Sequence, residues 1–244
     1  TISDTNNKML RSHIILNDTI WTIKESTIAL DKKWISVDSF IFSHGTQFLY
    51  VNGVNSSVAS DSINVHFSDL YLGYISDIIA NDDISFNGVA DGDVFVFKLF
   101  DMPYFKGDLY VYDSEINECV LGDMSIVSAW KDREKCIDFN AELLSPYRDN
   151  TNLSKSKLHG GVFLGNDSLY IGGKLKDVSM GFLRKYLKNV LQNNTGTVSG
   201  DIAAYGKFGN IGLEGMTYVK DMAFDVDFLK TSFVLSDSVK LTPH

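Results

Sequence analysis

The chain of 244 residues has only 3 prolines, although it contains 19 glycines. Proline interrupts a β-strand because it has no backbone N–H to donate to the neighbouring strand. Basic residues are also few: 22 Lys and Arg stand against 31 Asp and Glu, which gives a formal net charge of −9. Because the sequence contains no basic run that offsets this acidity, we expect no nucleic-acid partner.

Long apolar runs are missing as well. No stretch approaches the ~18 consecutive apolar residues of a membrane-spanning helix, and residues 1–8 lack the apolar segment of a signal peptide. Apolar residues nevertheless make up 44 % of the chain, enough to form a core. These counts favour an ordered protein rich in β-sheet.

Cysteine is scarce too, since Cys119 and Cys136 are the only two in the chain. Residues 121–130 and 135–143 are typical of a hairpin that turns at 131–134. In such a hairpin the cysteines lie at opposite ends of the strands, roughly ten residues of ~3.3 Å apart. A disulfide requires Cα atoms within ~7 Å, so we expect two free thiols.

The sequence has no signature of catalysis or metal binding. None of its five histidines has the His-Glu-x-x-His spacing of a zinc protease, and there is no Gly-x-Ser-x-Gly motif. No His or Cys stands at metal-ligand spacing. We therefore predict a non-enzymatic protein with no catalytic residues, no metal site and no cofactor.

Many segments alternate apolar and polar residues, which is typical of strands with one apolar and one solvated face. In 137–143 the apolar residues are Ile137, Phe139, Ala141 and Leu143, and in 224–228 they are Phe224, Val226 and Phe228. In residues 94–100 both alternating sets of positions carry apolar side chains, so we expect that segment to be covered on both faces.

Two segments favour short amphipathic helices. In 178–192, apolar residues recur at helical spacing from Leu183 to Leu191, and basic residues occupy the other side. Residues 70–80 are a weaker and shorter example. The first of these helices can cover one opening of a sheet, or its basic face can lie on a membrane.

An internal repeat is revealed by a shift of 108 residues, which aligns 69–116 with 177–224 without a gap. Identical residues include Asp69 with Asp177 and Asp113 with Asp221. Each unit has a strand, a short helix, a strand opened by Gly-Asp and a further strand pair.

The repeat predicts three parts of the chain. An N-terminal β segment (1–61) continues the sheet, a first repeat unit spans 62–168, and a second, truncated unit spans 169–244. The second unit ends before the hairpin that closes the first, so we expect a fragment of a longer repetitive protein.

The apolar strand face is compatible with two arrangements. In a compact sandwich a second sheet buries it, whereas in an elongated repetitive protein it lines a lengthwise groove. An apolar groove binds apolar chains, because each buried CH₂ contributes ~0.8 kcal/mol. The solvated opposite face keeps such a protein soluble.

Several segments match all or part of one pattern: Gly-x-Val/Ile, then a strand of the form Gly…Pro/Ile-x-Leu/Phe-x-Gly, then a strand containing Asp. They are residues 92–94 with 102–109, 121–123, 196–224 and 228–241. The pattern resembles the repeat of the TamB/AsmA-like family. It covers residues 62–244, and the first 60 residues fit it loosely as another turn of the same sheet.

The resemblance implies an all-β, elongated and strongly curved antiparallel sheet of the β-taco type with a hydrophobic inner groove. Members of that family are periplasmic proteins held in the inner membrane by an N-terminal helix, which would lie outside this chain. The implied function is non-enzymatic transfer of phospholipids, whose acyl chains occupy the groove, in outer-membrane biogenesis. TamB-type members also act with an outer-membrane barrel protein of the TamA/BamA type.

We expect the groove wall to consist of alternate apolar residues that make nonpolar contact with the acyl chains. The predicted wall residues are Ile63, Val65, Phe67, Val94, Val96, Val111, Ile137, Phe139, Leu143, Ile202, Val219, Phe224, Val226 and Phe228. Their common face is inferred from alternation, and a one-residue bulge would reverse it.

Two other functions stay open. A scaffold for outer-membrane barrel assembly would pair its sheet edge with strands of an unfolded barrel protein, and the scarcity of proline favours such an edge. A carbohydrate-binding or adhesive β-protein would instead form a site from aromatic and acidic residues on the solvated face.

Overall fold

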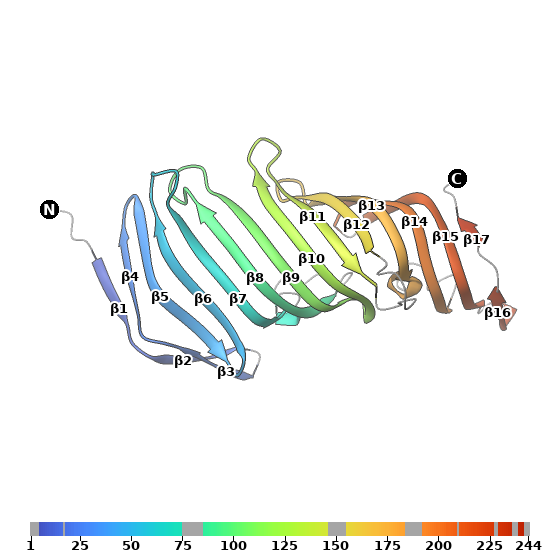
Figure 1. Cartoon of the computed structure of the whole chain (residues 1–244), viewed down its shortest axis with the longest axis horizontal. Coiled ribbons are helices and arrows are strands. Elements are labelled where there is room, and N and C mark those ends of the chain that lie inside the picture. The colour runs from blue at the N-terminus through green and yellow to red at the C-terminus, as the bar shows by residue number, and fades with distance from the viewer. Residues whose placement is uncertain are drawn as a thin grey trace.

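A computed structural model of the chain describes residues 5–16, 18–74, 85–145, 155–183, 192–208, 210–226, 229–235 and 239–241. These residues form 17 strands in one open antiparallel sheet that does not close into a barrel. Figure 1 shows the strands arrayed along the longest axis of the molecule, with the two termini at opposite ends. The predicted all-β class and the elongated, curved antiparallel sheet are confirmed.

The strands have the following bounds: β1 (Thr5–Met9), β2 (Ser12–Leu16), β3 (Thr19–Ile23), β4 (Ser26–Asp31), β5 (Trp34–His44), β6 (Gln47–Asn55), β7 (Ser62–Tyr71), β8 (Phe86–Phe97), β9 (Tyr104–Ile116), β10 (Cys119–Lys131), β11 (Cys136–Leu144), β12 (Lys155–Phe163), β13 (Ser168–Ser179), β14 (Gln192–Lys207), β15 (Asn210–Val226), β16 (Thr231–Leu235) and β17 (Val239–Leu241). A 3-10 helix, η1 (Met180–Leu183), follows β13.

The sheet is a meander in which each strand from β4 to β15 pairs with the next one in the sequence. At one end β4 also pairs with β1, and β3 connects β2 to β5. At the other end β15 pairs with both β16 and β17. The contacts are therefore mostly between neighbours, as in a repetitive protein.

The predicted hairpin is present, since β10 pairs with β11 and Lys131 stands opposite Cys136 beside the turn. Cys119 lies at the far end of β10, and both cysteines are free and buried. The expectation of two free thiols is confirmed. Burial also raises the pKa of the Cys136 thiol, which keeps it protonated at neutral pH.

Two expectations about local structure are wrong in part. Strand β8 ends at Phe97, and Phe95 is 38 % exposed, so residues 94–100 are neither one strand nor covered on both faces. Residues 178 and 179 belong to β13 and residue 192 to β14, not to a helix. Val178 pairs with Val198 in the sheet, and burial of both side chains outweighs the helical spacing.

The rest of the two predicted helices lies mainly outside the described residues. Within 70–80, residues 70 and 71 end β7, and residues 75–84 are not described. Within 178–192, η1 occupies residues 180–183, and residues 184–191 are not described.

The backbone follows the 108-residue repeat. Adding 108 to the bounds of β6 gives the bounds of β12, and the shifted β7, β8 and β9 fall within β13, β14 and β15. The left-handed residues correspond as well, because Asp69 and Asp177 have φ of 51° and 50°. Asp113 and Asp221 have φ of 47° and 51°. The structural correspondence thus takes in four successive strands.

These aspartates mark β-bulges, where one strand has an extra residue. The register of β7 against β8 shifts around Asp69, and that of β13 against β14 shifts around Asp177. At each bulge a side chain of the next strand accepts a hydrogen bond from the backbone N–H that the bulge leaves without a strand partner. Asp91 Oδ1 lies 2.7 Å from the nitrogen of Asp69, and Ser199 Oγ lies 2.9 Å from the nitrogen of Asp177. Bulges of this kind bend a strand and increase its twist.

The bent sheet curves around one of its faces. Helix η1 contacts both β10 and β14, and β10 approaches β13, although β11 and β12 lie between β10 and β13 in the sheet. Glycines allow close approach on that face: a Cβ on Gly92 would collide with the carbonyl oxygen of Asp108, and one on Gly200 with that of Met216. Only glycine fits there.

The bulge geometry makes a prediction at Asp113, whose side chain is exposed. Asp113→Val should lower the free energy of unfolding by about 1–2 kcal/mol, because a β-branched residue is strained at this φ. Asp113→Gly should change it by only a few tenths of a kcal/mol, since glycine adopts this φ freely. Urea denaturation measures both values, and equal losses for the two variants would contradict the assigned backbone conformation.

Candidate functional site

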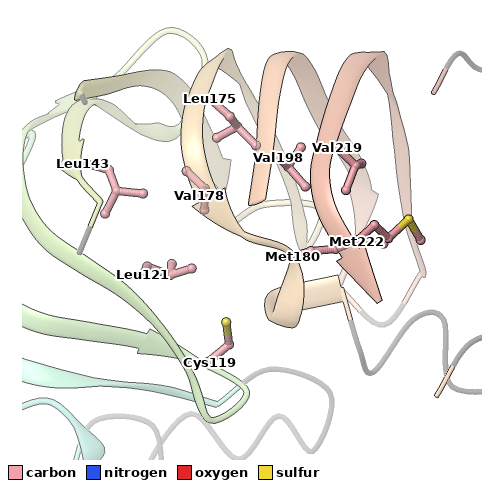
Figure 2. Packing of buried hydrophobic residues seen from close by; sticks show 9 residues of the cluster. All are labelled: Cys119, Leu121, Leu143, Leu175, Val178, Met180, Val198, Val219 and Met222. Carbon is pink, nitrogen blue, oxygen red and sulfur yellow. The ribbon is translucent and has the colours of Figure 1, made fainter. Parts of the chain in front are cut away.

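The strand register defines the two faces of the sheet. Residues that stand directly opposite each other on paired strands project to the same side, and neighbours along a strand alternate. We call the face that carries Phe139 and η1 the inner face, and the opposite one the outer face. Figure 2 shows inner-face side chains from several strands gathered near η1.

Every predicted wall residue that the structure describes lies on the inner face. The register carries this face continuously from Ile63 on β7 to Val226 on β15. The residues concerned are Ile63, Val65, Phe67, Val94, Val96, Val111, Ile137, Phe139, Leu143, Ile202, Val219, Phe224 and Val226. Phe228 lies outside the described residues.

The inner face carries no formal charge over most of the sheet. In the described parts of β5 to β15, apart from the bulge residues, the register places no Asp, Glu, Lys or Arg on it. Its polar side chains are small or uncharged, such as Ser128 opposite Phe139. Ten strand spacings of ~4.8 Å give this apolar surface a length of roughly 48 Å.

The predicted wall residues differ in how accessible they are. Ile63, Val111, Leu143 and Val219 are buried, with Val219 fully inaccessible, so their direct role is packing. The other described wall residues, including Val65, Phe139 and Val226, are half-buried and keep surface that an apolar ligand can contact.

The buried part of the inner face centres on η1. Met180, which is 1 % exposed, packs with Cys119 and Leu121 of β10 and with Val198 and Val219 of β14 and β15. Figure 2 shows these side chains on both sides of the short helix. Gly181 sits against Cys119, where an added Cβ would come within 2.8 Å of its sulfur. Helix η1 therefore closes the inner face at this point.

A similar contact occurs one repeat earlier. Trp21 on β3 is buried and stacks on Phe42, with ring centroids 4.7 Å apart. Tyr74, just after β7, approaches Trp21 edge-on at 5.8 Å. Tyr74 is the residue that the repeat aligns with Phe182 of η1, which packs against the core. Tyr74 after β7 and η1 after β13 thus both pack against the inner face.

The outer face carries the charges of the sheet and many exposed tyrosines. Two hollows adjoin each other over β12 to β15. The first, of about 590 Å³, brings together His159, Tyr170, Asp201 and Glu214, the residue types that a carbohydrate site would use. The second, of about 640 Å³, is lined by five lysines: Lys155, Lys157, Lys174, Lys176 and Lys220.

This lysine hollow was not foreseen from the sequence. Its lysines come from three strands, so they form no basic run along the chain. The only available signal was the spacing of Lys155 with Lys157 and of Lys174 with Lys176, which places each pair on one side of its strand. Recognising the cluster required the pairing of β12 with β13.

In the part of the chain that the structure describes, no group of three or more His, Cys, Asp and Glu side chains is arranged to hold a metal ion. Nor does any helix there combine the length and apolar character needed to span a membrane.

Comparison with known proteins gives no relative: no family model, no curated protein and no solved structure matches this chain.

The packing around η1 makes a stability prediction. Met180→Ala should lower the free energy of unfolding by about 2–5 kcal/mol, because it leaves a cavity in the core. Met216→Ala is the matched control: Met216 is 46 % exposed on the outer face, and its loss should cost no more than about 0.5 kcal/mol. Chemical denaturation measures both, and a Met180→Ala variant as stable as the control would mean that η1 does not pack on the sheet.

Proposed function

We propose that the inner face binds lipid acyl chains and conducts them along the sheet, as a non-enzymatic lipid-transfer segment. The observation that supports this most is the uncharged, half-buried inner face that extends across β5 to β15. An open sheet leaves such a face available, whereas a sandwich would bury it under a second sheet.

The energetics of acyl chains suit this surface. Each CH₂ removed from water contributes ~0.8 kcal/mol, and no charge has to be desolvated in the process. One leaflet of a bilayer is about 15 Å thick in its hydrocarbon part, well below the ~48 Å along the sheet. The inner face thus has room for an acyl chain at several successive positions, which transfer requires.

The resemblance of the repeat to the TamB/AsmA-like family agrees with this proposal. On that basis we propose that the protein works in the periplasm, in a longer protein anchored to the inner membrane, and delivers phospholipids for outer-membrane biogenesis. A barrel protein of the TamA/BamA type is the partner that the resemblance suggests.

Matched substitutions on one strand test the proposal. Phe139→Asp places a charge on the half-buried inner face, and Asn140→Asp places the same group on the outer face. Phe139→Asp should weaken lipid binding by about 2 kcal/mol, roughly thirtyfold, because the carboxylate must be desolvated. Fluorescent-phospholipid transfer between vesicles measures the effect, with Val65→Asp as a second inner-face variant.

Circular dichroism shows whether each variant folds. If folded Phe139→Asp and Val65→Asp transfer lipid as fast as Asn140→Asp, the inner face is not the path. If solvent extraction of the purified protein also yields no lipid, the proposed function is wrong.

The second candidate is a scaffold for barrel assembly, and the open ends of the sheet favour it. Among the described residues β16 pairs only with β15, and Val234 on β16 is 77 % exposed. A free strand edge offers unpaired backbone groups to an incoming strand.

Photo-crosslinking distinguishes the scaffold from the lipid path. A crosslinker at Val234 on the edge should capture an unfolded barrel polypeptide, whereas one at Val127, on the outer face of the central strand β10, should not. Equal capture at both positions, or none at Val234, would rule out edge pairing.

A further inference from the structure

We propose that the lysine hollow on the outer face docks the protein onto an anionic phospholipid membrane by binding lipid phosphate groups. The hollow is lined by Lys155, Lys157, Lys174, Lys176 and Lys220, and it lies on the face opposite to the proposed acyl-chain path. The inference therefore concerns a second surface and does not depend on the inner face.

Two of the lysines face each other across paired strands, and on their other sides they stand opposite Glu142 and Asp201. Lys157 and Lys174 stand directly opposite each other on β12 and β13. Like charges in this position destabilise a sheet, and a phosphate between them removes the repulsion. Lys176 follows on the same strand, and Lys220 borders the hollow from β15.

Neighbouring acids neutralise the cluster only in part. Glu142 contacts Lys155 at 3.2 Å and Lys157 at 3.6 Å, and the hydrogen bond from Lys155 lowers the pKa of Glu142. These side chains are well exposed, and exposed ion pairs are weak. Within the described residues, Lys174, Lys176 and Lys220 form no salt bridge.

The acids that line the hollow are fewer than its lysines. Asp177 and Asp201 are the only two, and Asp177 is hydrogen-bonded to Ser199. The hollow is thus positive in a chain with a net charge of −9. This contrast attracts an anion to one place on the molecule.

Apolar groups among the lysines favour a membrane over a soluble polyanion. Met216 and Tyr218 line the same hollow and are 46 % and 45 % exposed. Tyrosine and apolar side chains beside lysines are typical of surfaces that bind at the headgroup level of a bilayer. A soluble polyanion would need the lysines alone.

The rest of the outer face restricts docking to this end of the sheet. Over β8 to β10 it carries Asp91, Asp93, Asp108 and Asp123. Those carboxylates repel an anionic membrane, whereas the lysine hollow attracts it. The hollow, at about 640 Å³, has room for a headgroup phosphate among its lysines.

Vesicle co-sedimentation of the full chain tests the proposal. The probes are vesicles of pure phosphatidylcholine and vesicles with one third phosphatidylglycerol. The chain should bind the anionic vesicles alone, and binding should fall steeply as salt shortens the screening length. In the triple variant Lys157→Gln, Lys174→Gln, Lys220→Gln, binding should weaken roughly fivefold per lysine, on the order of a hundredfold in all.

The matched control is Lys32→Gln, Lys33→Gln, Lys106→Gln, which removes the same charge from exposed lysines elsewhere. It should bind anionic vesicles like the unmodified chain. Equal weakening by both triple variants, or binding that ignores salt and lipid charge, would overturn the proposal. So would binding of a short single-stranded DNA, with the same sensitivity to the lysine variant, in place of vesicle binding.

Failure of this proposal is distinguishable from failure of the acyl-chain path. The Phe139→Asp variant should still dock on anionic vesicles, and the lysine variant should still bind a fluorescent fatty acid in solution. Melting curves of both triple variants should match that of the unmodified chain, because the substituted side chains are exposed.

Discussion

The whole structure depends on the separation of charge and apolar surface onto opposite faces of one sheet. In strands β5 to β15 the charged side chains outside the bulges point outward and the inward-facing side chains are mostly apolar, and pairing in register carries this division from strand to strand. A shift by one residue anywhere would place carboxylates and lysines among the inner apolar groups. The same pattern therefore fixes the register and keeps charge off the inner face.

Bulges and glycines give this sheet its curvature without breaking the pattern. The Asp221 bulge explains why Val219 and Phe224 both lie on the inner face although they are five positions apart, an odd number. Beyond the extra residue, the positions that project to the inner face change from odd-numbered to even-numbered residues. Bulges at repeat-related positions bend the strands alike, and the curvature brings β10 and β14 close enough for η1 to contact both. The chain therefore encloses its apolar face partly and leaves the remainder half-exposed.

Much of this could be predicted from the sequence, because the relevant signals are local. Alternation placed Ile137, Phe139 and Leu143 on one face, and the turn residues located the β10–β11 hairpin. Features that depend on contacts between strands could not be predicted in this way. Val178 resembles the start of a helix until its pairing with Val198 is known. The lysine hollow likewise exists only because pairing brings lysines of separate strands together.

The most direct test of an inner face that holds acyl chains uses a tryptophan already present there. Trp130 stands opposite Ile137 on the inner face and is half-buried. Phospholipids with brominated acyl chains quench a tryptophan that they touch, so the account predicts quenching of the native protein that is strongly reduced in Trp130→Phe, which keeps Trp21 and Trp34. Fluorescence that is unaffected by brominated lipid, or equal quenching of the native protein and Trp130→Phe, would contradict the account.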